Sequence, residues 1–255
     1  ASGLRAVATD TRAQPTVAYE TTEYGEVVAS ESIAVVLSPE KSYTEAEAAR
    51  VREFVRDGGT LVVADDFRPH SNELLDRIGA SARVNATPLR DERSNYKAGD
   101  LPVATRTTTD PYTDGVDQLT LNHPATVTAN ESAVLVRSSN FSYLDVNRDG
   151  ELNDNETLRS YPIVTVEQLG TGDVIVISDP SLFINAMLER PDNRAFVRAL
   201  VSPHETVLLD HSHVENHPPL QVALFVLRSS SRVQFLSGAM ALGLLWTASR
   251  ISRNG

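Results

Sequence analysis

The sequence predicts an α/β fold, in which a mostly parallel sheet carries helices on both faces. Three observations predict it: a β-α-β pattern between residues 32 and 66, a β-hairpin between 161 and 178, and a helix followed by a buried strand between 193 and 209. The continuous apolar runs in these segments are typical of strands that are covered on both faces, as in parallel sheets. We also expect a β-rich insertion in the sheet and an apolar helix near the C-terminus.

The β-α-β unit is the clearest pattern in the chain. Its first strand is the apolar run IAVVL at residues 33–37, and its second is TLVVA at residues 60–64. Between them, Thr44 and Glu47 have the spacing of a capping box, which opens a helix. Gly58-Gly59 ends that helix. Its apolar face is formed by Ala48, Val51, Phe54 and Val55.

Weaker patterns predict the rest of the fold. Residues 85–145 are rich in Thr, Asp, Asn and Pro, with short alternating stretches, which predicts an insertion of loops and antiparallel strands at about 85–160. Pro218-Pro219 separates an α/β domain of residues 1–219 from a helical tail of residues 220–255. The other predicted elements are a helix at 71–78, a hairpin of strands at 161–168 and 173–178, a helix at 193–201 and a strand at 206–209.

The composition limits the class of protein. The net charge of −11 leaves no basic stripe that could neutralise phosphates, so we expect no nucleic-acid partner. The chain has no cysteine, which excludes disulfides, thiolate metal sites and a cysteine nucleophile. Lys41 and Lys97 are the only lysines, and with the abundant Asp, Glu and Thr this composition resembles that of proteins from halophilic archaea. Ordinary drift in a GC-rich genome would give a similar bias.

The C-terminal tail contains an uncharged segment at residues 233–249, between Arg232 and Arg250. As a helix this segment would extend about 25 Å, which is the short end of the length that crosses a bilayer. Trp246 and the basic residues beyond it suit a membrane interface with a cytoplasmic flank. We therefore expect a membrane span at 233–249, with the main domain on the extracytoplasmic side of the cell membrane. The alternative is a buried terminal helix.

The segment DVNRDGELNDNE, at residues 145–156, fills every position of a twelve-residue calcium loop. Acidic or amide side chains occupy positions 1, 3, 5 and 9, a glycine at position 6 permits the sharp turn, and a glutamate occupies position 12. The flanking sequence reads as strands, so we expect Ca²⁺ to have a structural role rather than to open paired helices as in a sensor. The alternative is a solvated acidic turn that binds nothing. The predicted ligands are Asp145, Asn147, Asp149, the carbonyl of Glu151, Asn153 and Glu156.

A second polar cluster, DHSHVENH, begins at Asp210, at the end of a predicted strand. Open α/β sheets bind ligands beyond the carboxyl ends of their strands. His211 and His213 lie on one side of an extended segment, where they could share a second metal, of open identity, with Asp210. The alternative is a polar link to the tail, in which the histidines bond to loop carbonyls. Asp65, Asp66 and Asp179 also follow predicted strands and are candidates for the same crevice.

Three segments carry a resemblance to a known family: residues 33–67, VEQLGTGDVIVISDPSLFIN at 166–185, and LLDHSH at 208–213. They resemble the domain-of-unknown-function family 4350, whose fold is similar to that of class I glutamine amidotransferases. The resemblance implies this fold over residues 5–215 and a setting beside membrane segments, but no established activity. Such amidotransferases carry a cysteine after the strand that here ends at Ala64. This chain has Asp65-Asp66-Phe67 there, so the resemblance does not extend to thiol chemistry.

Two functions of different classes are consistent with these patterns. The first is a non-enzymatic, membrane-anchored extracytoplasmic domain that binds a partner protein or a cell-envelope ligand and is stabilised by calcium. The alternative is a metal-dependent hydrolase that uses Asp210, His211 and His213. Whether the chain is an enzyme stays open, and the lack of a cysteine nucleophile favours the first function.

Overall fold

The structure is a computed structural model that describes residues 2–128 and 134–214. The chain divides into a unit of residues 1–213 and a second unit of residues 214–255. The predicted tail at 220–255, with its membrane span at 233–249, lies outside the described residues. Among the residues that are described, no helix combines the length and the apolar character needed to cross a bilayer.

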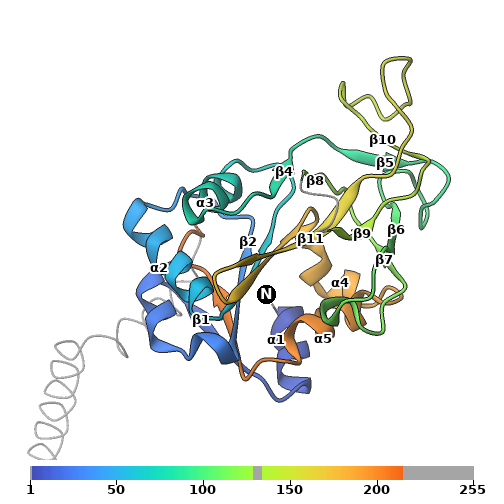
Figure 1. The fold of residues 1–255 in the computed structure, drawn as a ribbon. Coiled ribbons are helices and arrows are strands. Elements are labelled where there is room, and N and C mark those ends of the chain that lie inside the picture. Colours follow the sequence, from blue (N-terminus) through green and yellow to red (C-terminus); the bar gives the residue numbers. More distant parts are fainter. Residues whose placement is uncertain (1, 129–133, 215–255) are drawn as a thin grey trace, which may run out of the picture. The chain divides into compact units, whose positions relative to one another are not determined.

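Within the described residues, a nine-stranded sheet has the order β1-β13-β2-β3-β12-β11-β9-β6-β7 (Figure 1). The first five strands of this order run parallel, and the last four are joined antiparallel. The predicted mixed α/β fold around a large parallel sheet is therefore confirmed. The strands are β1 (Gln14–Ala18), β13 (Thr206–Asp210), β2 (Ser32–Leu37), β3 (Thr60–Ala64), β12 (Gly172–Ile177), β11 (Pro162–Leu169), β9 (Val134–Arg137), β6 (Val103–Arg106) and β7 (Gln118–Thr120).

Helices cover both faces of the sheet, which explains the continuous apolar strands. In β2, Ile33 and Val35 belong to one buried cluster, whereas Ala34 and Val36 belong to a second cluster on the opposite face. The first cluster includes side chains from α1 and α5, and the second includes side chains from α2 and α3. The helices are α1 (Ser2–Asp10), α2 (Glu45–Arg56), α3 (His70–Ile78), α4 (Asn185–Leu188) and α5 (Asn193–Val201), with short 3₁₀ turns η1 (Thr21–Glu26), η2 (Ala29–Glu31), η3 (Pro111–Thr113) and η5 (Pro180–Phe183).

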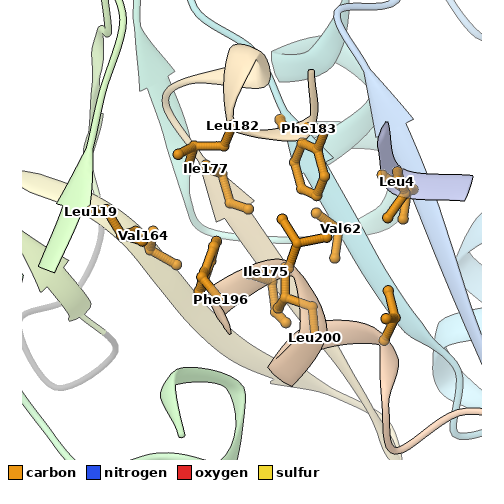
Figure 2. Close-up of a cluster of buried hydrophobic side chains, with 14 of the residues drawn as sticks. Leu4, Val62, Leu119, Val164, Ile175, Ile177, Leu182, Phe183, Phe196 and Leu200 are labelled. Atoms are coloured by element: carbon orange, nitrogen blue, oxygen red, sulfur yellow. The ribbon is translucent and has the colours of Figure 1, made fainter. Parts of the chain in front are cut away.

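The first cluster joins the parallel and the antiparallel halves of the sheet into one core. Figure 2 shows Phe196 and Leu200 of α5 beside Ile175 of β12, with Val62 of β3 on one side and Leu119 of β7 on the other. All of these side chains are buried. Because one helix contacts strands from both halves, the antiparallel strands share the main hydrophobic core with the parallel strands.

The ends of α2 form as the sequence predicts. The Thr44 hydroxyl accepts a hydrogen bond from the Glu47 amide at 3.3 Å, and the Glu47 carboxylate accepts one from the Thr44 amide at 2.7 Å. This reciprocal pair satisfies two backbone donors that the helix leaves open. At the other end Gly58 has a φ of +101°, a left-handed conformation that glycine adopts without strain.

The insertion after α3 adds strands to the sheet and forms two small ribbons. β4 (Arg83–Asn85) pairs with β8 (Thr126–Thr128), and β5 (Leu89–Asp91) pairs with β10 (Ser142–Leu144), both antiparallel. The loop at residues 145–156 follows β10 and extends away from the sheet (Figure 1). This part of the chain therefore places the predicted calcium loop at the edge of the domain.

Two N-terminal elements of the structure, α1 and β1, are not predicted from the sequence. α1 has nine residues, and its buried apolar side chains Leu4, Val7 and Ala8 extend over little more than one turn, so its apolar pattern is short. β1 contains Pro15, and proline has a low strand propensity because it lacks a backbone N–H donor. β1 lies at the edge of the sheet, where a missing donor is tolerated. Pairing with β13 over the whole length of β1 decides its conformation.

Candidate functional site

Asp210, at the carboxyl end of β13, is the centre of a buried hydrogen-bond network. Its Oδ2 accepts hydrogen bonds from the hydroxyls of Tyr24 at 2.7 Å and Tyr43 at 3.0 Å. Its Oδ1 accepts from the amide of Ser212 at 2.7 Å and from the Ser212 hydroxyl at 2.6 Å. Burial, followed by the Asp210 charge, raises the pKa of both tyrosines well above the usual value, so both phenols remain donors. Asp210 is 5% exposed, and both of its oxygens are engaged.

His213 continues this network. Its Nδ1 lies 2.7 Å from the Ser212 hydroxyl, its Nε2 lies 3.5 Å from Oε2 of Glu47, and its ring stacks on Tyr43 with centroids 3.6 Å apart. The single Ser212 hydroxyl proton is directed to the carboxylate of Asp210, which can only accept, so Nδ1 of His213 is the donor to Ser212. A serine activated for attack would instead give its proton to the histidine.

His211 contacts different residues from those that His213 contacts. Its amide donates to the carbonyl of Ala18 at 2.8 Å, and its ring meets Tyr19 edge-on at 6.3 Å between centroids. Across the described part of the chain, no three side chains of His, Asp or Glu are grouped so that they could hold a metal ion. The predicted Asp210, His211 and His213 ligand set is therefore not assembled in this conformation.

Asp65, Asp66 and Asp179 lie together at the ends of two neighbouring strands, β3 and β12. Asp65 accepts from the Ser71 hydroxyl at 2.5 Å and from the Asp66 amide at 2.8 Å, and burial raises its pKa. Asp179 accepts from the Asn122 amide at 2.7 Å and from the Ser181 amide at 2.8 Å. Burial, with a contribution from the charge of Asp66, raises the pKa of Asp179 to about 6.

The predicted crevice residues thus fall into two groups. β2 lies between β13 and β3, so Asp210 is separated from Asp65 by two strand spacings, or roughly 10 Å. The two groups share no hydrogen-bond partner among the described residues. Asp65, Asp179 and Asp210 each accept a hydrogen bond from an amide one or two residues later, which holds the backbone that follows the strand, and Asp179 and Asp210 also accept from distant segments.

The loop at residues 145–156 is closed by the carboxylates at its first and last positions. Asp145 is buried and accepts hydrogen bonds from the amides of Asp149 at 3.1 Å and Gly150 at 3.0 Å. Glu156 accepts from the amides of Val146 at 2.8 Å and Asn153 at 3.1 Å, which lie on opposite sides of the loop. Gly150 has a φ of +80°, the turn for which the sequence provides a glycine.

Asp149, at position 5 of this loop, is exposed. It accepts hydrogen bonds from the side-chain amides of Asn147 at 2.7 Å and Asn153 at 3.1 Å and from the amide of Glu151 at 2.9 Å. These bonds, with that from Glu151 as the largest contribution, lower the pKa of Asp149. The carboxylates of the loop are therefore held by N–H donors and are not gathered around one point, in line with the lack of a grouped metal site in the described residues.

Comparison with models of known protein families identifies the family of this chain. A family model described as "Domain of unknown function (DUF4350)" matches residues 1–201. The chain belongs to the DUF4350 family. This confirms the family membership that the motifs at residues 33–67 and 166–185 indicate, whereas the third motif, at residues 208–213, lies beyond the matched residues. No curated protein sequence matches this DUF4350 chain.

Solved structures similar to this DUF4350 chain show its fold alone. The mmIFT52 N-terminal domain has a TM-score of 0.52 and 14% identity, over 70% of this chain and 77% of that one. A β-galactosidase from Bacillus circulans sp. alkalophilus has a TM-score of 0.37 and 16% identity, over 67% of this chain. The match covers 21% of the β-galactosidase, so this chain spans about a fifth of that enzyme. The cytoplasmic protein STM1381 from Salmonella typhimurium LT2 has a TM-score of 0.43 and 9% identity, over 78% of this chain and 85% of that one.

Four partners in the Asp210 network of this DUF4350 chain were missed by the sequence reasoning: Tyr24, Tyr43, Glu47 and Ser212. Ser212 lies within the DHSHVENH cluster, and an Asp followed two residues later by Ser is a common turn pattern that could have identified it. Tyr24 lies in η1 and Tyr43 in the loop before α2, and both are far from Asp210 in the sequence, separated from it by 186 and 167 residues. No local pattern connects them to it, because their contact depends on the pairing of β13 with β1 and β2.

Proposed function

We propose that this chain is a non-enzymatic binding domain for a partner protein or a cell-envelope ligand, stabilised by a calcium ion. In this proposal the loop at residues 145–156 holds the ion, the segment at 233–249 crosses the membrane, and the main domain lies outside the cytoplasm. The sheet would be a variant of the class I glutamine amidotransferase-like fold, in a protein from a halophilic archaeon.

The closure of the calcium loop is the observation that carries this proposal. The carboxylates of Asp145 and Glu156 accept hydrogen bonds from amides of the loop itself, so both are directed into it. Each carboxylate oxygen has two acceptor positions, and one amide bond leaves the other position for a cation. A flip of the side-chain amides of Asn147 and Asn153 would replace their N–H donors by oxygens. In the proposed calcium-bound state, the carboxylates move toward one point and form with these amide oxygens the shell of oxygen ligands that calcium prefers.

The bonding of Asp210 supports a binding role over catalysis. Its two oxygens accept from four donors, and Ser212 directs its proton to this carboxylate. A hydrolase that used Asp210, His211 and His213 around a metal would have to break these bonds and reorient His213 away from Tyr43. The environment of Asp210 therefore favours the structural interpretation of the DHSH segment over the hydrolase.

Calcium titration followed by thermal melting tests the calcium part of the proposal. An extracellular site with a Kd of about 10⁻⁴–10⁻³ M adds about 1.4–2.7 kcal/mol to the free energy of unfolding at about 10 mM calcium. For a unit of 213 residues, this raises the melting temperature by about 3–6 °C. We expect this rise to disappear in Asp145→Ala and to persist in Asp154→Ala, which changes an acidic residue at a non-ligand position of the same loop.

Three results would contradict the proposal. A melting temperature that calcium leaves unchanged in the unmodified chain would remove the calcium site. Equal responses of Asp145→Ala and Asp154→Ala would assign the effect to general charge screening. Stoichiometric zinc or manganese in the purified chain, lost in His211→Ala, would favour the hydrolase instead.

A further inference from the structure

A small cleft lies beside the base of the calcium loop. It has a volume of about 210 Å³ and lies between the β4–β8 ribbon, the end of β9 and the start of β11. Figure 1 shows β4 and β8 next to β11 at this point. Leu144, which precedes the loop, and Arg159, which follows it, both line the cleft. We name this space the Arg159 cleft; its other polar lining residues are Asn85, Thr126, Thr128, Arg137 and Ser160.

The charge of the Arg159 cleft differs from that of the chain. The sequence contains 34 acidic residues against 23 basic ones, yet two arginines and no acidic residue line the cleft. Its uncharged polar residues carry hydroxyl and amide donors. The described lining carries no negative charge, and Arg159 supplies a positive charge that favours an anion.

Arg159 is exposed, with its backbone held by a hydrogen bond and its guanidinium lying over an aromatic ring. Its backbone amide donates to the carbonyl of Ser142 at 2.9 Å, and its guanidinium lies over the ring of Tyr161 at 4.7 Å. Tyr161 is held in turn by its amide, which donates to the Ser138 hydroxyl at 2.9 Å, and by its phenol, which donates to the Thr157 carbonyl at 3.0 Å. Within residues 2–128 and 134–214, no carboxylate forms an ion pair with Arg159. A guanidinium that is stacked on an aromatic ring keeps its N–H donors available at its edge.

We propose that the Arg159 cleft binds one oxyanion group, a carboxylate or a phosphate, at the end of a larger ligand. The planar fork of a guanidinium matches both groups with two parallel hydrogen bonds. The cleft is smaller than the 300–1,000 Å³, roughly, of pockets that enclose a whole small molecule, so it fits one charged group and a few attached atoms. This inference rests on the proposed binding function, for which it names the chemical class of the ligand.

Binding of small anions to the full chain tests the inference. We would titrate inorganic phosphate and, separately, acetate, each replacing chloride at constant ionic strength, and follow binding by calorimetry. We expect at least one of them to bind above the chloride background and Arg159→Gln to weaken that binding at least tenfold, the usual effect of losing a charge-assisted hydrogen bond. Arg198→Gln, which removes an exposed arginine from α5, should bind as the unmodified chain does.

The outcomes separate the possible sources of the anion. Binding of phosphate alone would support a phosphate-bearing ligand, and binding of acetate alone would support a carboxylate. No binding of either anion above chloride would overturn the inference, as would equal weakening in Arg159→Gln and Arg198→Gln. Arg159→Lys keeps the charge but loses the planar fork, so weaker binding in a variant with unchanged melting temperature separates recognition from folding.

The same titrations on the chain after its calcium has been removed on a chelating resin, and the acetate titration repeated with calcium added, keep this inference distinct from the calcium proposal. Anion binding that depends on Arg159 in the calcium-free chain would support the cleft even if calcium has no effect on melting. A calcium-dependent melting temperature without anion binding would preserve the calcium loop and reject the cleft.

Discussion

Removal of the two phenol hydroxyls that reach Asp210 is the sharpest test of the network at the end of β13. Tyr24 and Tyr43 both donate to the same carboxylate oxygen, at 2.7 and 3.0 Å, and both side chains are at most 3% exposed. Tyr24→Phe and Tyr43→Phe each remove a single hydroxyl and leave the ring in place. Each change therefore tests one hydrogen bond with little effect on packing.

The expected magnitudes follow from the bonding of this oxygen. A hydrogen bond to a charged group contributes about 1.5–3 kcal/mol, so each single variant should lower the free energy of unfolding by about that amount. In a single variant, the other tyrosine still satisfies Oδ2 of Asp210. In the double variant that oxygen has no donor, which adds a desolvation penalty of about 1–3 kcal/mol. The double variant should therefore lose more than the sum of the two single changes.

Equilibrium unfolding in urea, analysed by linear extrapolation, measures all four proteins of this double-mutant cycle. Tyr96→Phe is the matched control, because Tyr96 is 40% exposed and its hydroxyl has no hydrogen-bond partner among the described residues. It should change the free energy of unfolding by less than about 0.5 kcal/mol. If Tyr24→Phe and Tyr43→Phe behave like this control, or if the double variant is simply additive, Asp210 is not the buried structural centre described above.

Three further predictions concern other parts of the domain. Both ring nitrogens of His204 are buried without a partner in the described residues, and burial lowers its pKa to about 4. In the unfolded chain the imidazole of His204 takes up a proton with a pKa of about 6.5. The free energy of unfolding should therefore fall by at most about 2 kcal/mol from pH 7 to pH 5. Urea unfolding at the two pH values should show a smaller fall in His204→Leu. Gly172→Ala would place a Cβ against the carbonyl oxygens of Gly59 and Val55, so it should lower the melting temperature by more than about 5 °C; an unchanged value would contradict this close approach. Phe196→Ala should cost about 3–5 kcal/mol in urea unfolding, because its fully buried ring contacts both halves of the sheet, whereas a loss below about 1 kcal/mol would contradict that placement.

Sequence reasoning predicts the fold where local signals and the tertiary structure agree. The capping box at Thr44 forms as expected, and the helix predicted at residues 193–201 has the bounds found in the structure. Both segments have an apolar face of helical period that is strong enough to decide their conformation. β1 shows the opposite case, since a segment with Pro15 becomes a strand only because β13 provides a parallel neighbour.

The candidate sites depend more on contacts that are distant in the sequence. Position in the chain places Asp210 at a strand end, where ligand sites are common, but does not show that two tyrosines already use its carboxylate. The calcium loop differs, because the residues that close it lie within twelve positions, so its spacing predicts the closure by Asp145 and Glu156. The Arg159 cleft could not be predicted, since its wall combines residues from five separate segments of the chain.

The position of β13 has a mechanical consequence. β13 is hydrogen-bonded to β1 on one side and to β2 on the other, parallel to both and over its whole length. A pulling force applied along β13 from its carboxyl end would load both rows of hydrogen bonds in shear, all at once. A strand at the edge of a sheet can be peeled away one bond at a time, which takes less force. If the domain is tethered through the residues that follow β13, the tether begins at a strand that resists extraction under tension.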